Sequence, residues 1–220
     1  SFAGDAVVAG GADARCLMTL RGFNSLGIMN PGACTPFGAD RQGMNIGEGG
    51  AFVLIEREPA AGQTDPVYLL GCGESLDAYH MTSPHPDGVG AQAAMREALA
   101  QAGLAPADVD HINAHGTGTA QNDAAESKAI EAVFGCDVPV TSTKGYTGHL
   151  LGACASTEAV FSILAVQEGW IPASLGADPR DPDIGIHIPT TRLHRDVRYV
   201  LSNAFAFGGN NASVLFGRRP

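Results

Sequence analysis

The chain has 220 residues, of which 45% are hydrophobic and 16% charged, a composition that predicts a folded globular protein and excludes a disordered chain. The net charge is −10, with 13 Lys and Arg against 23 Asp and Glu, so no surface for nucleic acid is expected. The longest apolar run, residues 150–166, is shorter than a membrane span and contains Glu158, so no membrane helix is predicted.

The sequence has five cysteines, an odd number that cannot pair completely. They are widely spaced, and no Cys-x-x-Cys pair occurs among them. This pattern argues against a disulfide framework or a zinc site and favours a reducing, cytoplasmic compartment. The sequence starts at Ser1 and enters a strand-like segment almost at once. We therefore expect this start to be a cut through a fold, the alternative being a complete protein from which a tag was removed.

The first part of the chain, residues 1–58, predicts a strand, a helix and a second strand. The strand at residues 5–9 is expected to stop at the glycines that follow it. The helix is predicted at 19–27 and the second strand at 51–56. Polar residues 59–65 then form a predicted connector between two domains.

The second part of the chain, residues 66–220, alternates strands and helices. An Asp and a Glu three residues apart, Asp123 and Glu126, fit a capping box at the start of one helix. Because the strands are continuously apolar, the sequence predicts an α/β layered fold with both faces of the sheet covered. The predicted strands are 67–72, 109–114, 138–142, 197–203 and 212–216, and the predicted helices are 88–102, 123–134 and 150–167.

Two polar segments follow predicted strands and contain histidines. In N-A-H-G-T-G-T at 113–119, a strand leads His115 into a Gly/Thr turn where a ligand can approach the backbone closely. In S-T-K-G-Y-T-G-H at 142–149, a strand leads to Lys144 and then to His149. A histidine at a helix N-terminus is favoured in its neutral form, which suits a donor or base. The alternatives are a structural histidine and a polar helix entry.

Two further features need an explanation. Glu158 lies in an apolar helix, where a carboxylate requires a cation such as Lys144 or a metal ion, or else stays protonated. In S-N-A-F-A-F-G-G-N-N at 202–211, two aromatic residues lie beside two glycines. This turn is either a movable gate or a glycine-rich turn with core aromatics.

Together, in this order, these segments resemble the C-terminal part of the β-ketoacyl-acyl-carrier-protein synthases, the elongating condensing enzymes of fatty acid and polyketide pathways. The resemblance implies a thiolase-like five-layer αβαβα sandwich, in which residues 1–58 end the first half and 66–220 form the second. It also implies an acyl-carrier-protein partner and a homodimer or heterodimer of synthase subunits. The remaining segments that carry it are A-G-G-A-D-A at 9–14, P-F-G-A-D-R at 36–41 and G-E-G-G-A at 47–51.

The resemblance assigns roles to residues by motif, and it requires no cofactor. The residues that resemble the family's catalytic groups are His115, His149 and Lys144. Those that resemble the pantetheine-binding and gating positions are Thr117, Thr119, Phe205, Phe207, Gly208 and Gly209. Those that match a structural Na⁺ or K⁺ site of some members are Asn113, Glu158, Ser202 and Asn203.

The chain also departs from the family pattern. The nucleophilic cysteine of the family lies upstream of this sequence, so the chain alone is expected to be inactive in acyl transfer. Smaller departures are Gly38 in place of Asp, Ala206 in place of Gly and Asn210 in place of Thr. One alternative is a non-catalytic chain-length-factor-like partner subunit, which the three retained catalytic residues disfavour. A thiolase-type enzyme is disfavoured because no cysteine follows in the C-terminal turn. The acyl chain, the primer and the pathway stay undecided.

Overall fold

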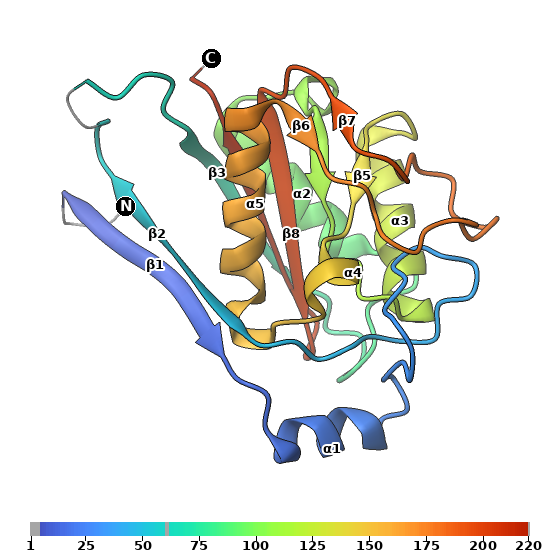
Figure 1. Ribbon diagram of the computed structural model, residues 1–220. Helices are drawn as coiled ribbons and strands as arrows, with labels where there is room; N and C mark the ends of the chain where they lie inside the picture. Colours follow the sequence, from blue (N-terminus) through green and yellow to red (C-terminus); the bar gives the residue numbers. More distant parts are fainter. Residues whose placement is uncertain (1–4, 60–61, 220) are drawn as a thin grey trace.

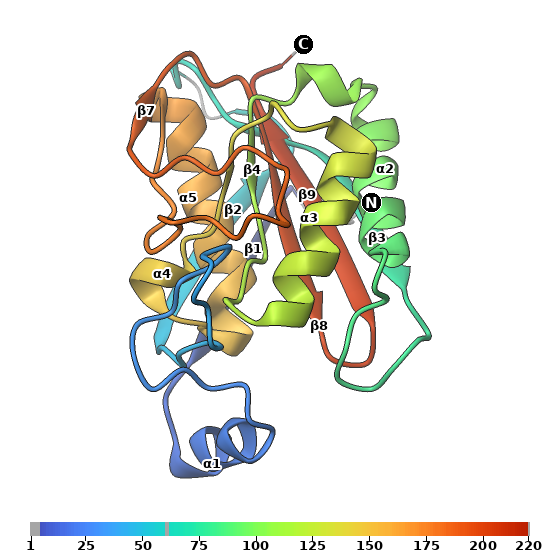
Figure 2. The same ribbon diagram turned by 90° about the vertical axis from the view of Figure 1, so that its right-hand side faces the viewer.

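The computed structural model describes residues 5–59 and 62–219. The first four residues of the predicted first domain, and residues 60–61 of the predicted connector 59–65, lie outside the described part. Figures 1 and 2 show the chain as a layered α/β fold with a central sheet. Of the described helices, none has the length and hydropathy of a membrane span.

The N-terminal part forms an antiparallel two-stranded sheet of β1 (Ala6–Asp13) and β2 (Gly49–Glu56). Helix α1 (Leu17–Ser25) follows β1 and buries none of its residues. The prediction that the glycines after residue 9 stop the strand is wrong, since β1 runs through both. A Cβ at Gly10 would overlap the main chain of β2, and one at Gly11 would overlap the carbonyl of Gly152. The two glycines therefore allow β1 to pack closely against β2 and against Gly152.

The central sheet has five strands in the order β3-β9-β8-β4-β5. The short strand β4 runs parallel to its two neighbours, β5 and β8, while β9 is antiparallel to β3 and β8. A separate pair of two-residue strands, β6 and β7, follows the last helix and was not predicted from the sequence. The strands are β3 (Tyr68–Leu76), β4 (His111–Asn113), β5 (Val140–Thr141), β6 (Trp170–Ile171), β7 (Leu193–His194), β8 (Tyr199–Ala206) and β9 (Asn210–Gly217).

Helices cover both faces of this sheet. Helices α2 and α3 lie on one face, and α5 lies on the other, between β8 and the β1–β2 pair (Figures 1 and 2). This order of sheet, helix, sheet and helices corresponds to four layers of the predicted five-layer sandwich. The helices are α2 (Val89–Ala102), α3 (Ala120–Phe134), α4 (Lys144–Thr147) and α5 (Cys154–Glu168), with 3-10 turns η1 (Pro106–Asp108) and η2 (Leu151–Ala153).

The predicted capping box at the start of α3 is wrong. The helix begins at Ala120, so Asp123 and Glu126 lie inside it, and both carboxylates are buried. Both accept main-chain N–H groups of the turn that leads into the helix, and neither caps the N-terminus of the helix. A sequence pattern shows the spacing of two acids but not the turn that folds back over them.

The largest hydrophobic cluster packs α2 and α3 against β4, β8 and β9. Its fully buried members include Met95, Ile112, Ile130, Leu201 and Leu215. Burying such side chains stabilises the fold by roughly 1.5–3 kcal/mol each. The ends of β4 and β5 are therefore rigid, and the polar turns that follow them are fixed in position.

Candidate active site

His115 lies just beyond β4, and hydrogen bonds from its main chain hold it in place. Its N–H donates to Glu126 Oε1 at 2.8 Å, and the N–H of Gly116 donates to Glu126 Oε2 at 2.7 Å. Gly116 has a φ of +37°, and a Cβ there would lie 2.5 Å from the Cβ of Ser142. The turn therefore requires glycine, and the buried carboxylate fixes the direction in which the His115 ring leaves the strand.

His149 reaches the same place from the turn between α4 and η2. The centroids of the His115 and His149 rings are 5.3 Å apart, with an 83° angle between the planes. The N–H of Leu151 donates to His149 Nδ1 at 3.0 Å, so the proton of the neutral ring is on Nε2. The structure thus brings together the two histidines that lie 34 positions apart in the sequence.

Both imidazoles are kept neutral by their surroundings. Burial, and secondarily the nearby charge of Lys144, lowers the pKa of His149 to about 3. Burial, followed by the charges of Lys144 and His149, lowers the pKa of His115 well below its usual value. Two neutral rings in a buried site can donate Nε2–H to one oxygen without carrying a charge themselves.

Lys144 is the cation that the buried Glu158 requires. Its Nζ donates to Glu158 Oε1 at 2.5 Å, and both side chains are almost completely buried. Burial alone would lower the pKa of Lys144, but the Glu158 carboxylate raises it above its usual value, so the lysine is protonated. The same Nζ donates to the carbonyl of His115 at 2.5 Å and lies 3.5 Å from its Nδ1. Nδ1 therefore acts as an acceptor, and Nε2 carries the proton of His115 as well.

The two predicted pantetheine threonines lie beside each other in the turn after His115. Thr117 Oγ1 and Thr119 Oγ1 are 2.8 Å apart, within hydrogen-bond distance. Gly118 between them has a φ of +76°, and a Cβ there would lie 2.8 Å from Cys34 Sγ. The turn presents hydroxyl groups with little steric bulk, which suits the approach of an extended polar chain.

The predicted gate is a three-residue turn between β8 and β9. Phe205 is within the strand, with its ring centroid 5.7 Å from that of His115. Phe207 is 45% exposed, and its ring centroid lies 6.0 Å from that of Phe23 in α1. Gly208 and Gly209 have φ values of +86° and +81°. The inner aromatic is therefore fixed in the sheet, and the outer one lies on a turn of glycines.

The four residues predicted to hold a monovalent cation are not all on one face of the sheet. In the described part of the chain, Asn113 Oδ1 and Glu158 Oε2 are buried without a hydrogen-bond partner, and Ser202 lies opposite Asn113 in the parallel ladder. Asn203 points to the other face, where it donates to Glu126 Oε1 at 3.2 Å. The structure therefore brings three of these side chains together and places the fourth with the carboxylate that holds His115.

Sequence reasoning missed a second carboxylate that supports the site. Asp123 accepts the N–H of Phe37 at 2.8 Å and that of Gly118 at 3.2 Å, and Arg41 approaches it to 3.8 Å. Phe37 has a φ of +63° and is fully buried. The motif around Phe37 thus fixes the threonine turn. An acid one turn into a helix, directly after a Gly/Thr loop, is the signal that could have shown this.

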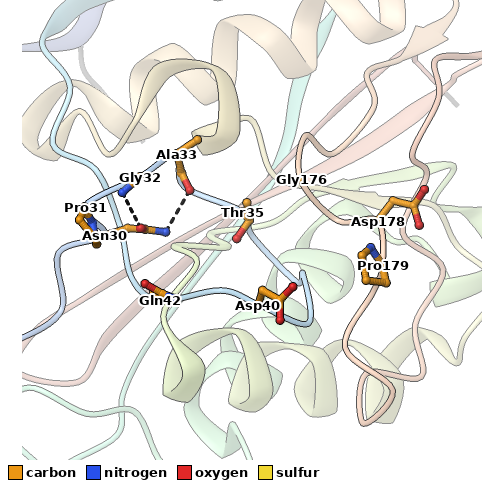
Figure 3. Close-up of a pocket in the computed structure, with 10 residues that line it drawn as sticks. All are labelled: Asn30, Pro31, Gly32, Ala33, Thr35, Asp40, Gln42, Gly176, Asp178 and Pro179. Atoms are coloured by element: carbon orange, nitrogen blue, oxygen red, sulfur yellow. Dashed lines mark hydrogen bonds between the residues drawn. The ribbon is translucent and has the colours of Figure 1, made fainter.

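A cavity of about 370 Å³ lies next to the 30–42 segment, apart from the histidines (Figure 3). Among its described lining residues there is none of the predicted catalytic or gating residues. In Figure 3 the Asn30 side chain closes its own turn, with Asn30 Oδ1 accepting the N–H of Gly32 and Nδ2 donating to the carbonyl of Ala33. The lining residues are Asn30, Pro31, Gly32, Ala33, Thr35, Asp40, Gln42, Gly176, Asp178 and Pro179.

Comparison with known proteins identifies this arrangement. Residues 67–178 match the family model of the beta-ketoacyl synthase C-terminal domain, and residues 3–61 match that of the N-terminal domain. The chain belongs to the β-ketoacyl synthase family.

Two curated proteins resemble the chain over nearly its whole length. It is 39% identical to nodulation protein E of Rhizobium sp. (strain N33), over 96% of this chain and 54% of that protein. It is 42% identical to the mitochondrial 3-oxoacyl-[acyl-carrier-protein] synthase of Arabidopsis thaliana, over 96% of this chain and 50% of that protein.

A solved structure shows the same fold. A chain of the solved complex between the ketosynthase ApeO and its chain length factor ApeC from Xenorhabdus doucetiae matches 97% of this chain, over 53% of its own length, with a TM-score of 0.89 and 43% identity. The thiolase-like fold expected from the motifs is therefore confirmed. The chain spans about half the length of these relatives and corresponds to their C-terminal part.

Proposed function

We propose that the full-length protein is a 3-oxoacyl-[acyl-carrier-protein] synthase. It would condense an acyl thioester with malonyl-acyl carrier protein, with loss of CO₂, in fatty acid or polyketide synthesis. The observation that carries this proposal is the pair of neutral imidazoles, His115 and His149, whose rings lie 5.3 Å apart beside the buried Lys144. The family membership and the relatives' names support the same reaction class.

The histidines would act on the malonyl thioester. Their Nε2–H groups would donate to its carbonyl oxygen, where negative charge grows as the bond to the carboxylate breaks. The electron pair of that bond becomes the enolate, and CO₂ leaves. The enolate carbon then attacks the acyl carbonyl, forms the new carbon–carbon bond and expels the thiolate that carried the acyl group. Charged imidazoles would hold the enolate too tightly to react, which is why the low pKa values matter.

Lys144 would act through His115 and not on the substrate. Its Nζ is enclosed by Glu158 and by the carbonyl and Nδ1 of His115. It would hold the ring in the tautomer with Nε2–H facing the substrate. Thr117 and Thr119 would bind the phosphopantetheine arm of the carrier protein, and the turn that contains Phe207 would open for the acyl chain.

The acyl group requires a nucleophilic cysteine that this chain does not supply by motif. We propose that the preceding part of the full-length protein supplies it, and that the chain alone does not form an acyl-enzyme. A buried Na⁺ or K⁺ would fit the two unpartnered oxygens of Asn113 and Glu158, because hard cations take oxygen ligands. Such an ion would coordinate these two oxygens and would take no part in the reaction.

The test is malonyl-acyl carrier protein decarboxylation by the full-length protein, followed as CO₂ release. The expected result is turnover that His149→Ala reduces by at least about 100-fold, in line with the loss of an oxyanion-hole donor. The matched control His187→Ala changes an exposed histidine and should keep turnover within twofold. Absence of decarboxylation in the unchanged protein, in the presence of the carrier protein, would refute the proposal.

A chain-length-factor-like partner subunit is the second candidate. It is supported by the similarity to a ketosynthase that is solved in complex with a chain length factor. Copurification of a second synthase chain that carries the nucleophile, together with no decarboxylation by the protein alone, would favour it. Dimerisation with a copy of itself together with turnover would favour the synthase.

A further inference from the structure

His149 is placed by a segment from the other part of the chain. Its N–H donates to the carbonyl of Asn45 at 2.7 Å, and its own carbonyl accepts the N–H of Gly47 at 3.1 Å. Ile46 and His149 thus form a short parallel β-bridge. Gly148 comes so close that a Cβ there would lie 3.0 Å from the carbonyl of Asn45. The position of the catalytic ring therefore follows the position of residues 45–47.

The side chain of Asn45 fixes that segment in turn. Its Oδ1 accepts the N–H of Cys34 at 2.7 Å, and its Nδ2 donates to the carbonyls of Asn30 at 3.0 Å and Gly32 at 2.9 Å. One amide thus makes three hydrogen bonds to the turn at 30–34.

The same turn also contacts the loop that follows His115. Cys34 Sγ donates to the carbonyl of Thr117 at 3.2 Å, and the N–H of Gly43 donates to the carbonyl of Gly118 at 3.0 Å. A continuous chain of bonds therefore runs from the threonine turn through Cys34 and Asn45 to the main chain of His149. It joins two loops that leave the sheet from different strands.

We propose that Asn45 is a positioning residue for His149, setting the distance between the two histidine rings through the turn at 30–34. The inference rests on the proposed condensation reaction. It goes beyond that reaction because it assigns a role to a residue that touches neither histidine side chain. Without the three side-chain bonds, residues 45–47 lose their anchor, and the His149 ring shifts relative to His115. Misplacement of a reacting group by about 1 Å can cost on the order of 100-fold in rate.

Two variants and one control separate positioning from loop stability. Asn45→Ala removes all three bonds. Asn45→Asp keeps the size and the bond to Cys34 but loses both donors, so it should act in the same direction if the alanine variant does not fold. The control, Gln42→Ala, removes an exposed amide of the same segment that makes none of these hydrogen bonds (Figure 3). A general effect of changing this segment would be shared by the control.

The experiment uses the full-length protein and three readouts: malonyl-acyl carrier protein decarboxylation, transfer of the acyl group to the nucleophile, and hydrogen exchange of the peptide that contains His149. For Asn45→Ala we expect kcat for decarboxylation to fall at least about tenfold with KM within twofold. Acyl transfer should stay within twofold. The His149 amide should exchange at least about tenfold faster. Gln42→Ala should leave all three unchanged.

The outcomes that overturn the inference are specific. Equal losses in Asn45→Ala and Gln42→Ala would show a general loop effect, and so would an equal loss in acyl transfer and decarboxylation. If the unchanged protein shows no decarboxylation, the proposed function fails. The exchange of the His149 amide still decides the positioning role, because unchanged protection in Asn45→Ala would refute it.

Discussion

The buried pair Lys144 and Glu158 gives the strongest test of how this site is held together. Replacing Lys144 with Met keeps an unbranched side chain of similar length but leaves the Glu158 carboxylate without its cation. It also removes the 2.5 Å hydrogen bond to the carbonyl of His115. Breaking one partner of a buried ion pair costs about 3–5 kcal/mol. For a chain of this size that corresponds to a melting temperature lowered by roughly 6–20 °C.

The double variant Lys144→Met with Glu158→Gln separates the pair from the packing. Its glutamine carries no charge, so the burial penalty of the carboxylate disappears. We expect at least about half of the lost stability to return. The matched control is Lys128→Met, because Lys128 lies 3.6 Å from Asp87 in an exposed ion pair. Such a pair contributes about 0–1 kcal/mol.

The assay is urea unfolding of the chain between pH 5 and pH 9, followed by circular dichroism. Burial raises the pKa of Glu158, and the Lys144→Met variant removes the charge and hydrogen bond of Lys144 that lower it. When the pKa of a carboxyl group is higher in the folded than in the unfolded state, the folded protein is most stable at pH values low enough to protonate that group. The single variant should therefore lose further stability as the pH rises above the unfolded value, and the double variant should not. A loss below about 1 kcal/mol in Lys144→Met, or no recovery in the double variant, would refute the reasoning.

Three other results are expected. The rate of decarboxylation by the full-length protein should not change from pH 6 to pH 8, because burial lowers the pKa of His149 to about 3 and that of His115 well below its usual value. A step in the rate near pH 6.5 would contradict two neutral, buried rings. Gly116→Ala should destabilise the chain by about 2–4 kcal/mol in the same urea assay, since the φ of this residue is +37° and the new Cβ would overlap a neighbouring side chain. The control Gly22→Ala, which has open space around it, should not lower the free energy of unfolding. Phe207→Ala should speed acyl transfer of bulky acyl groups relative to short ones in a competition assay, and equal rates would remove its role as a gate.

The sequence alone predicted the parts of the site that depend on local pattern. Apolar strands that lead into Gly/Thr and Lys/His motifs singled out His115 and His149. The expectation that a long helix starts directly after His149 is wrong, because His149 lies in the turn between α4 and η2, and α5 begins at Cys154. The lone carboxylate in an apolar helix required a cation, and Lys144 is that cation in the structure. Strand, turn and burial are open to such reasoning because they are short-range properties of composition and spacing.

Only the tertiary structure decided which groups the buried acids and amides serve. Glu126 has the sequence spacing of a helix cap, but its carboxylate accepts the main-chain N–H of His115. Asn203 also donates to Glu126, on the face of the sheet opposite to Asn113. Asn45 carried no motif at all, yet it links two catalytic loops. The reason is physical: a hydrogen bond depends on which groups are within about 3 Å after folding, and the sequence order does not contain that distance.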